Sequence, residues 1–139
     1  MRIFVNKPGV VYDPLKTTVI FAEDMQEIKT RLDGGRVFSG SGAGPIAVSA
    51  DDYDVVQFAP DQTTLTLSNF TGTPVNGQKM LVELFANGND VALTFGTDYV
   101  SGGVDLPTDF LDGERLTLGF IYSTLGGLNK WRLVASSLV

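Results

Sequence analysis

Clustered carboxylates are the residues of this sequence whose types and spacing come nearest to those of a reactive or metal-binding site. The segment "ADDYD" contains Asp51, Asp52 and Asp54, and Ca²⁺ favours such groups of oxygen ligands. Their spacing matches no EF-hand loop, so we interpret them as the solvated start of a strand. A second acidic segment, "DFLDGE" at 109–114, could pair with the first for glycoside cleavage. Because any acidic β protein offers such pairs, we predict no metal ion, no cofactor and no catalysis.

Histidine and cysteine are both absent from the chain. Without histidine the commonest general base and the commonest transition-metal ligand are missing, and without cysteine neither a disulfide nor a thiolate zinc site can form. Serine and threonine are abundant, but only lysine or carboxylates remain to activate them. The segment "SGSGAG" has neither the lysine nor the helix start of a phosphate-binding loop. We therefore expect a protein that is not an enzyme.

Aromatic residues are the remaining candidates for ligand binding. Tyrosine and tryptophan rings stack on sugars because their faces are apolar while their polar groups form hydrogen bonds. Tyr122 and Trp131 lie in strand patterns, which favours core or hairpin positions for both. Tyr99 instead follows Asp98 in a glycine-rich loop that also contains Asp105. Long loops on β scaffolds often carry binding residues, so these last three are our candidate ligand-binding residues.

The elements that would position these residues are strands, because apolar residues recur at every second position from Tyr53 onward. The runs "DVVQFA" and "TTLTLSN" predict two strands. The runs "QKMLVELFA" and "NDVALTFG" flank Asn87-Gly88, a dipeptide that favours two-residue hairpin turns. A hairpin here places Val82 opposite Leu93, with further apolar pairs on either side.

A second hairpin is predicted from "RLTLGFIYS" and "KWRLVASS", in which Trp131, Leu133 and Ala135 share a face. Six or so strands without any strand–helix–strand alternation predict an all-β fold, an antiparallel β-sandwich or jelly roll.

The N-terminal part has a different pattern. Prolines in residues 1–18 favour an extended arm. A short helix is predicted from about 22 to 32, because the apolar residues near it recur at helical spacing. This stripe packs either on its own domain or on symmetry mates or a larger assembly, and we treat it as a candidate particle or subunit interface. Its members are Phe21, Met25, Ile28 and Leu32.

Three segments follow from these patterns: an N-terminal anchor arm and helix at 1–38, a Gly/Ser linker at 39–50, and an antiparallel β-domain at 51–139. The formal charge of −6 is divided unevenly, with +1 in residues 1–36 and −7 in residues 37–139. An acidic body repels phosphates, so we expect no nucleic-acid partner. No apolar run approaches the roughly 20 residues of a membrane helix, so we expect no membrane insertion.

Three segments of the β-domain, "TTLTLSNFTG", "NGQKMLVELFANGNDVALTFGTDYVSGG" and "KWRLVASS", together resemble the C-terminal β-domains of bacteriophage virion proteins. Such domains occur in tail fibres, head fibres and capsid decoration proteins, and the resemblance covers roughly residues 52–139. The segment "VIFAEDMQEIKTRL" looks like the short helix that precedes these domains in fibre proteins.

This resemblance implies a homotrimeric virion component, made in the host cytoplasm, whose N-terminal part binds capsid or tail proteins and whose β-domain is displayed outside. About 45 residues precede the β-domain, which is too few for a long shaft. A capsid decoration protein or a short head or tail fibre is therefore expected. The alternative is a receptor- or carbohydrate-binding adhesin module that binds a host surface glycan through the loop at 97–114.

Overall fold

The structure is a computed structural model, and it describes residues 35–139. Within these residues the chain is all-β, with nine strands and a single turn of 3-10 helix at Leu125–Gly127. They form one compact unit that begins at Arg36. The predicted arm and helix lie outside the described residues, as do Phe21, Met25, Ile28 and Leu32.

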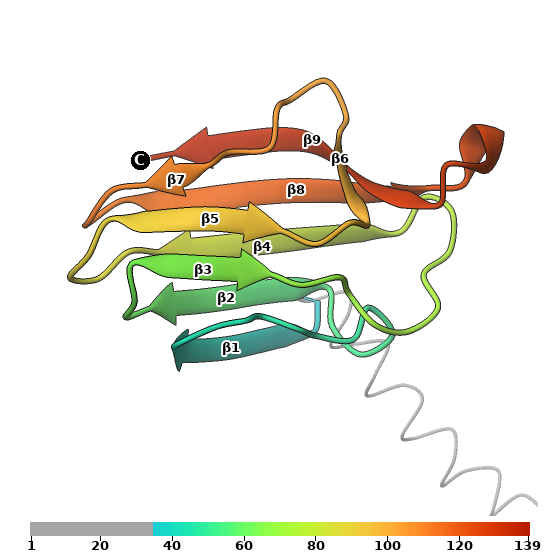
Figure 1. The fold of residues 1–139 in the computed structure, drawn as a ribbon. Helices are drawn as coiled ribbons and strands as arrows, with labels where there is room; N and C mark the ends of the chain where they lie inside the picture. Colours follow the sequence, from blue (N-terminus) through green and yellow to red (C-terminus); the bar gives the residue numbers. More distant parts are fainter. Residues whose placement is uncertain (1–34) are drawn as a thin grey trace, which may run out of the picture. The chain divides into compact units, whose positions relative to one another are not determined.

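The larger sheet has six strands in the order β1-β2-β4-β8-β9-β6 (Figure 1). The β4–β8 and β8–β9 pairs are antiparallel, whereas β1–β2, β2–β4 and β6–β9 are parallel. The strands are β1 (Val37–Gly42), β2 (Val55–Pro60), β4 (Lys79–Phe85), β6 (Tyr99–Ser101), β8 (Arg115–Ser123) and β9 (Lys130–Leu138).

The smaller sheet has three strands in the order β3-β5-β7 and lies over one face of the larger sheet (Figure 1). Its β3–β5 pair is parallel and its β5–β7 pair is antiparallel. Both sheets are therefore mixed, and the expectation of purely antiparallel sheets is wrong. The β2–β4 and β3–β5 pairs are parallel because the strand between them in the sequence lies in the other sheet and returns the chain. Between β1 and β2 the chain returns through the segment around Ile46, which runs beside β3. The strands are β3 (Thr64–Leu67), β5 (Val91–Phe95) and β7 (Asp109–Phe110).

The core is made of the apolar side chains that the two sheets direct at each other. Alternation in β3, β4 and β8 buries every second residue, as the sequence predicts. Among residues 35–139, no polar or charged residue is classed as buried, and no helix has the length and hydropathy of a membrane span. The largest fully buried side chains are Trp131, Phe110, Phe120, Ile46, Leu65, Leu67, Met80, Leu84, Leu118 and Leu133.

The predicted hairpin between β4 and β5 is wrong. Val82 is paired with Leu118 in the larger sheet, whereas Leu93 is paired with Leu65 in the smaller one. Both Val82 and Leu93 are buried, in the core that the two sheets share. An alternating apolar face suits contact between two sheets as well as it suits a hairpin, so the pattern alone did not distinguish them.

The connection between β4 and β5 has other partners that explain why it does not close a hairpin. The N–H of Gly88 donates to a carboxylate oxygen of Asp112 at 2.6 Å, and the N–H of Ala86 donates to the carbonyl oxygen of Glu114 at 3.0 Å. The turn is thereby held by the segment that precedes β8, and the chain crosses from one sheet to the other.

The predicted hairpin between β8 and β9 is confirmed, with Tyr122 opposite Trp131. A β-bulge interrupts the register, because Phe120 pairs with Leu133 while Gly119 pairs with Ala135. The extra residue moves Ala135 to the opposite face from Trp131 and Leu133. The prediction that these three share a face is therefore wrong for Ala135.

Residues 39–50 are not the linker that their glycines and serines suggested. The first four belong to β1, and Ile46, Val48 and Ala50 are buried in the core. The N–H of Ile46 donates to the carbonyl oxygen of Thr66 at 2.9 Å, so this segment runs beside β3. The alternation of Ile46, Val48 and Ala50 is a strand signal that the preceding glycines obscured.

Candidate functional site

The outer face of the larger sheet carries the side chains that alternation directs away from the core. In β4, Met80, Val82 and Leu84 are buried, so Lys79, Leu81, Glu83 and Phe85 lie on the opposite, outer face. The registers of β1, β2, β8 and β9 then align the outward residues of neighbouring strands into rows. Together these rows make up the outer surface of the larger sheet.

One of these rows is apolar along its whole length. Each member is the register partner of the next, and the row crosses five adjacent strands, a distance of about 19 Å. Val37 is 45% exposed and Leu81 is 42% exposed, so the row is open to solvent. We call it the apolar row; its members are Val37, Val55, Leu81, Gly119 and Ala135.

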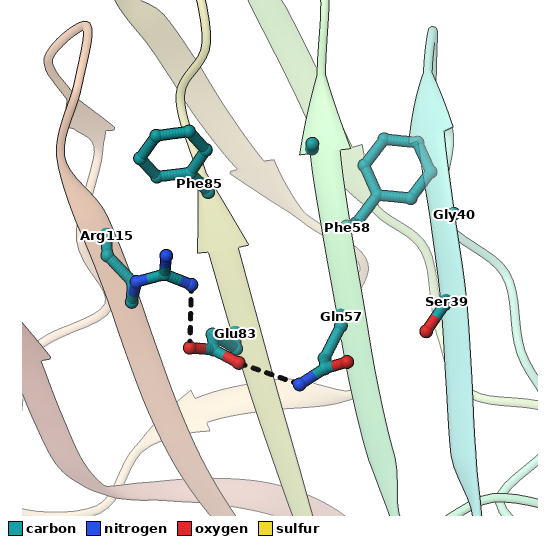
Figure 2. Close-up of a pocket in the computed structure, with 8 residues that line it drawn as sticks. Ser39, Gly40, Gln57, Phe58, Glu83, Phe85 and Arg115 are labelled. Carbon is teal, nitrogen blue, oxygen red and sulfur yellow. Dashed lines mark hydrogen bonds and ion pairs between the residues drawn. The ribbon is translucent and has the colours of Figure 1, made fainter.

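The next row along the strands is polar and is centred on Glu83. The amide of Gln57 donates to one carboxylate oxygen of Glu83 at 3.0 Å, and the guanidinium of Arg115 donates to the other at 2.9 Å (Figure 2). The Arg115 guanidinium also lies 5.0 Å from the ring centroid of Phe85, a cation–π distance. Three neighbouring strands are thereby joined by a chain of polar contacts on the sheet surface.

A shallow hollow of about 260 Å³ lies over this polar row, lined by residues of β1, β2, β4 and β8 (Figure 2). Gly40 is one of its lining residues and contributes only backbone atoms to it. A Cβ atom on Gly40 would lie 3.0 Å from Cδ2 of Phe58, so the Phe58 ring occupies the space beside this glycine. The hollow is smaller than a typical small-molecule site and is open on one side.

A second hollow, of about 330 Å³, lies beside the start of β3. Its lining includes Gln62, Thr64 and Thr66 but no charged side chain. These residues can form hydrogen bonds with a ligand, but they offer no acid, base or nucleophile with an activating partner.

The outer face of the larger sheet also has a charge opposite to that of the unit as a whole. Residues 36–139 contain five Lys/Arg and eleven Asp/Glu, a net charge of −6. On the outer face, however, Lys79, Arg115 and Arg132 accompany a single carboxylate in the strands, that of Glu83. This surface is therefore a positive region on an acidic unit.

Tyr99 is a core residue and not the exposed ligand-binding residue that we predicted. It is 5% exposed, and its hydroxyl donates to the carbonyl oxygen of Ser68 at 2.7 Å. Burial raises the pKa of its phenol well above the ordinary value, and the charge of nearby Asp98 acts in the same direction. A buried ring cannot stack on a sugar at the surface. The alternative of a carbohydrate-binding module at the loop 97–114 therefore lacks the exposed aromatic ring that it assigned to Tyr99.

The two predicted neighbours of Tyr99 remain at the surface but do not converge with it on a site. The carboxylate of Asp98 lies 3.7 Å from the ammonium of Lys130, and its main-chain N–H donates to Asn69. Asp105 is exposed in the connection between β6 and β7. Sequence reasoning missed the short strand β6, which places Tyr99 opposite Trp131.

Carboxylates of the two acidic segments, 51–54 and 109–114, accept hydrogen bonds from main-chain N–H groups. A carboxylate oxygen of Asp51 accepts from the N–H of Thr73 at 3.0 Å, and Asp54 accepts from the N–H of Arg36 at 3.0 Å. Glu114 accepts from the N–H of Leu111 at 2.8 Å. In residues 35–139 no group of three or more acidic side chains is arranged to hold a metal ion.

The outer rows could not be read from the sequence, because the strand order that aligns them was unknown before the structure. Together they form a broad surface suited to contact with another macromolecule, since apolar area and positive charge lie side by side over several strands. Comparisons of the chain with protein-family models, curated proteins and solved structures found no match.

Proposed function

We propose that the chain is a non-enzymatic bacteriophage virion structural protein, either a capsid decoration protein or a short head or tail fibre. It assembles as a homotrimer and attaches to other virion proteins through its N-terminal segment. The observation that carries this proposal is the exposed apolar row on the larger sheet. The solvated face of a sheet usually presents polar residues, and a continuous apolar stretch on it favours protein–protein contact.

Two features of the sequence support the same proposal. The resemblance to virion β-domains covers roughly residues 52–139, and the charge changes sign between the N-terminal part and the body. We further propose that the two sheets belong to a β-sandwich, with one outer face used for assembly. In this proposal the body is a rigid scaffold, and its contacts rather than any chemistry are its function.

The particle itself provides the direct test of this function. Virions purified from the source of the chain should contain it by mass spectrometry, and antibodies against residues 36–139 should label the outside of the particle. Absence of the chain from purified virions that contain all other structural proteins would refute the proposal.

The solution mass of the purified full chain tests the proposed homotrimer. Light scattering should give three times the chain mass of 14.9 kDa. A monodisperse monomer at every concentration tested would count against trimer formation.

The proposed role of the N-terminal segment is tested by deleting residues 1–35, which leaves the described unit whole. The truncated chain should retain the circular dichroism of a β protein but should no longer bind particles that lack the protein. Binding equal to that of the full chain would show that attachment lies in the β unit.

A further inference from the structure

A second group of exposed apolar side chains belongs to the end of the unit where β8 begins and β9 ends. Figure 1 shows this end beside the C-terminus. Leu111 is 53% exposed in the turn before β8, and Leu138 is 51% exposed near the end of β9. These two residues belong to the same end of the unit. Leu138 is the register partner of Leu116, the second residue of β8, and Leu111 lies in the turn just before that strand. We call this surface the end patch.

The end patch has the opposite charge to the outer face of the larger sheet. Asp109, Asp112 and Glu114 all lie within three residues of Leu111. Asp112 and Glu114 are held in place by main-chain N–H groups, at 2.6 Å from Gly88 and 2.8 Å from Leu111. Arg115 also lies at this end, but its guanidinium is paired with Glu83 at 2.9 Å. The end patch is therefore apolar with a net acidic border.

The other surface is the apolar row with its basic border, which we call the face patch. Leu81 is its central exposed side chain. Lys79 and Arg132 lie in the neighbouring outward row, and Arg115 lies two rows away on the other side of Leu81. One carboxylate, Glu83, lies among them, and it is neutralised by Arg115 at 2.9 Å. The face patch is therefore apolar with a net positive border.

The charges decide which contact between two copies is favourable. Two face patches in contact would bring positive borders together, and two end patches would bring carboxylates together, and both arrangements cost free energy. A face patch against an end patch joins apolar to apolar and basic to acidic. This contact uses different surfaces on the two copies, so it is heterologous, and such contacts generate rings when their rotation closes.

We propose that the occupant of the face patch is a second copy of this chain, which binds through its end patch, and that this contact builds the homotrimer. The proposal rests on the proposed function only for the number of subunits. The contact itself follows from the two complementary surfaces of the described unit.

Two single substitutions separate the two sides of the contact. Leu81→Glu adds a charge to the face patch, and Leu111→Glu adds one to the end patch. Each alone should weaken self-association of the full chain by at least about 30-fold, because each replaces an apolar side chain at the centre of the interface by a carboxylate that loses its water on binding. Leu125→Glu is the matched control, since Leu125 is exposed at the tip between β8 and β9, outside both patches.

Mixing the two variants gives the decisive measurement. The Leu81→Glu chain keeps an intact end patch, and the Leu111→Glu chain keeps an intact face patch. Equal amounts should therefore form a one-to-one pair, but no larger ring, in native mass spectrometry. A face-to-face contact predicts instead that Leu111→Glu has no effect and that mixing restores nothing, and either result would overturn the proposal. Equal dissociation by Leu125→Glu would also overturn it.

A second pair of variants covers the case in which a leucine substitution unfolds the chain. Arg132→Glu on the face patch and Asp109→Lys on the end patch reverse border charges and leave the apolar residues unchanged. Each alone should weaken association. Mixing should restore association above that of either variant alone, because both contacts between unlike chains then join opposite border charges. High salt should weaken the wild-type oligomer, because the complementary borders are screened. Unchanged association in both charge variants would contradict the proposed pairing.

Failure of the proposed function would give a different result from failure of this contact. If the chain is not a virion protein, it is absent from purified particles while the mixed variants still form pairs. If the contact is wrong, the chain is present on particles while mixing restores no pair.

Discussion

The hydroxyl of Tyr99, in β6 of the larger sheet, donates a hydrogen bond of 2.7 Å to the carbonyl oxygen of Ser68, immediately after β3 of the smaller sheet. The ring is packed edge-on against Phe70, with centroids 5.4 Å apart, and is tilted against Phe120 at 5.2 Å. One side chain thus joins the two sheets by both apolar contact and a hydrogen bond.

Replacing Tyr99 by phenylalanine should lower the free energy of unfolding by about 1–2 kcal/mol near pH 7, because the Ser68 carbonyl loses its phenol donor. Urea unfolding measures this difference. The matched control is Tyr53→Phe, since Tyr53 is only partly buried and its ring packs against Phe38 at the edge of the core. A loss no greater than that of the control would contradict the structural role of the hydrogen bond.

The difference in unfolding free energy between wild type and Tyr99→Phe should also depend on pH. The pKa of the Tyr99 phenol is raised in the folded chain, mainly by burial, whereas in the unfolded chain it ionises near pH 10. Its contribution to stability is therefore complete below about pH 10 and is lost as the pH rises further. The advantage of wild type over Tyr99→Phe should shrink by up to about 1.4 kcal/mol per pH unit above that point. A difference independent of pH from 8 to 11 would show that the phenol ionises equally in both states.

Gly40 should tolerate no side chain without loss of stability. A Cβ there would lie 3.0 Å from Cδ2 of Phe58 and 3.3 Å from Cε2 of Phe38, so Gly40→Ala should destabilise by about 1–3 kcal/mol. Gly119→Ala is the matched control, because its Cβ would meet Ala135 at an ordinary 3.5 Å. Thermal unfolding of both variants measures the contrast. Equal melting temperatures would mean that the Phe58 ring moves aside freely.

Arg115 should matter little for folding. Its side chain is 47% exposed, so the ion pair with Glu83 is screened by solvent, and Arg115→Gln should cost less than about 1 kcal/mol in urea unfolding. The glutamine removes the charge and the cation–π contact with Phe85 but retains an N–H donor. A loss above about 2 kcal/mol would show that the polar row is a folding element rather than part of a contact surface.

Engineered cysteines can report the strand order directly, because the natural chain has none. Glu83 is the register partner of Thr117, so the double variant Glu83→Cys, Thr117→Cys should form a disulfide on mild oxidation. The double variant Glu83→Cys, Ala92→Cys should stay reduced, although a β4–β5 hairpin would bring these two residues together. Mass spectrometry of alkylated samples distinguishes the two results.

Alternation of apolar residues allowed the all-β class and much of the core to be predicted. Leu65, Leu67, Val82 and Leu118 are buried as their spacing indicates. The β8–β9 hairpin was also predictable, because its strands are consecutive and lie in one sheet. These features depend on local pattern, which the sequence contains.

Which strand pairs with which was not predictable from the sequence, because the same alternating apolar face can be buried in more than one arrangement of strands. The Asn87-Gly88 dipeptide favours a hairpin locally, but hydrogen bonds from Gly88 and Ala86 to the segment before β8 override it. Tyr99 was misassigned for a similar reason. Its neighbouring glycines suggest a loop, whereas the pairing of β6 with β9 buries its ring. Both errors concern contacts between residues far apart in the sequence.

The crossing between β4 and β5 has a consequence for synthesis of the protein. β4 is joined to β2 on one side, but its other edge is covered only by β8, which follows β5, β6 and β7 in the chain. During translation that edge stays open until Arg115–Ser123 has left the ribosome, on the order of seconds at ordinary elongation rates. An open strand edge is a template for pairing with another nascent chain. Expression at a slower elongation rate should therefore lower the yield of soluble protein.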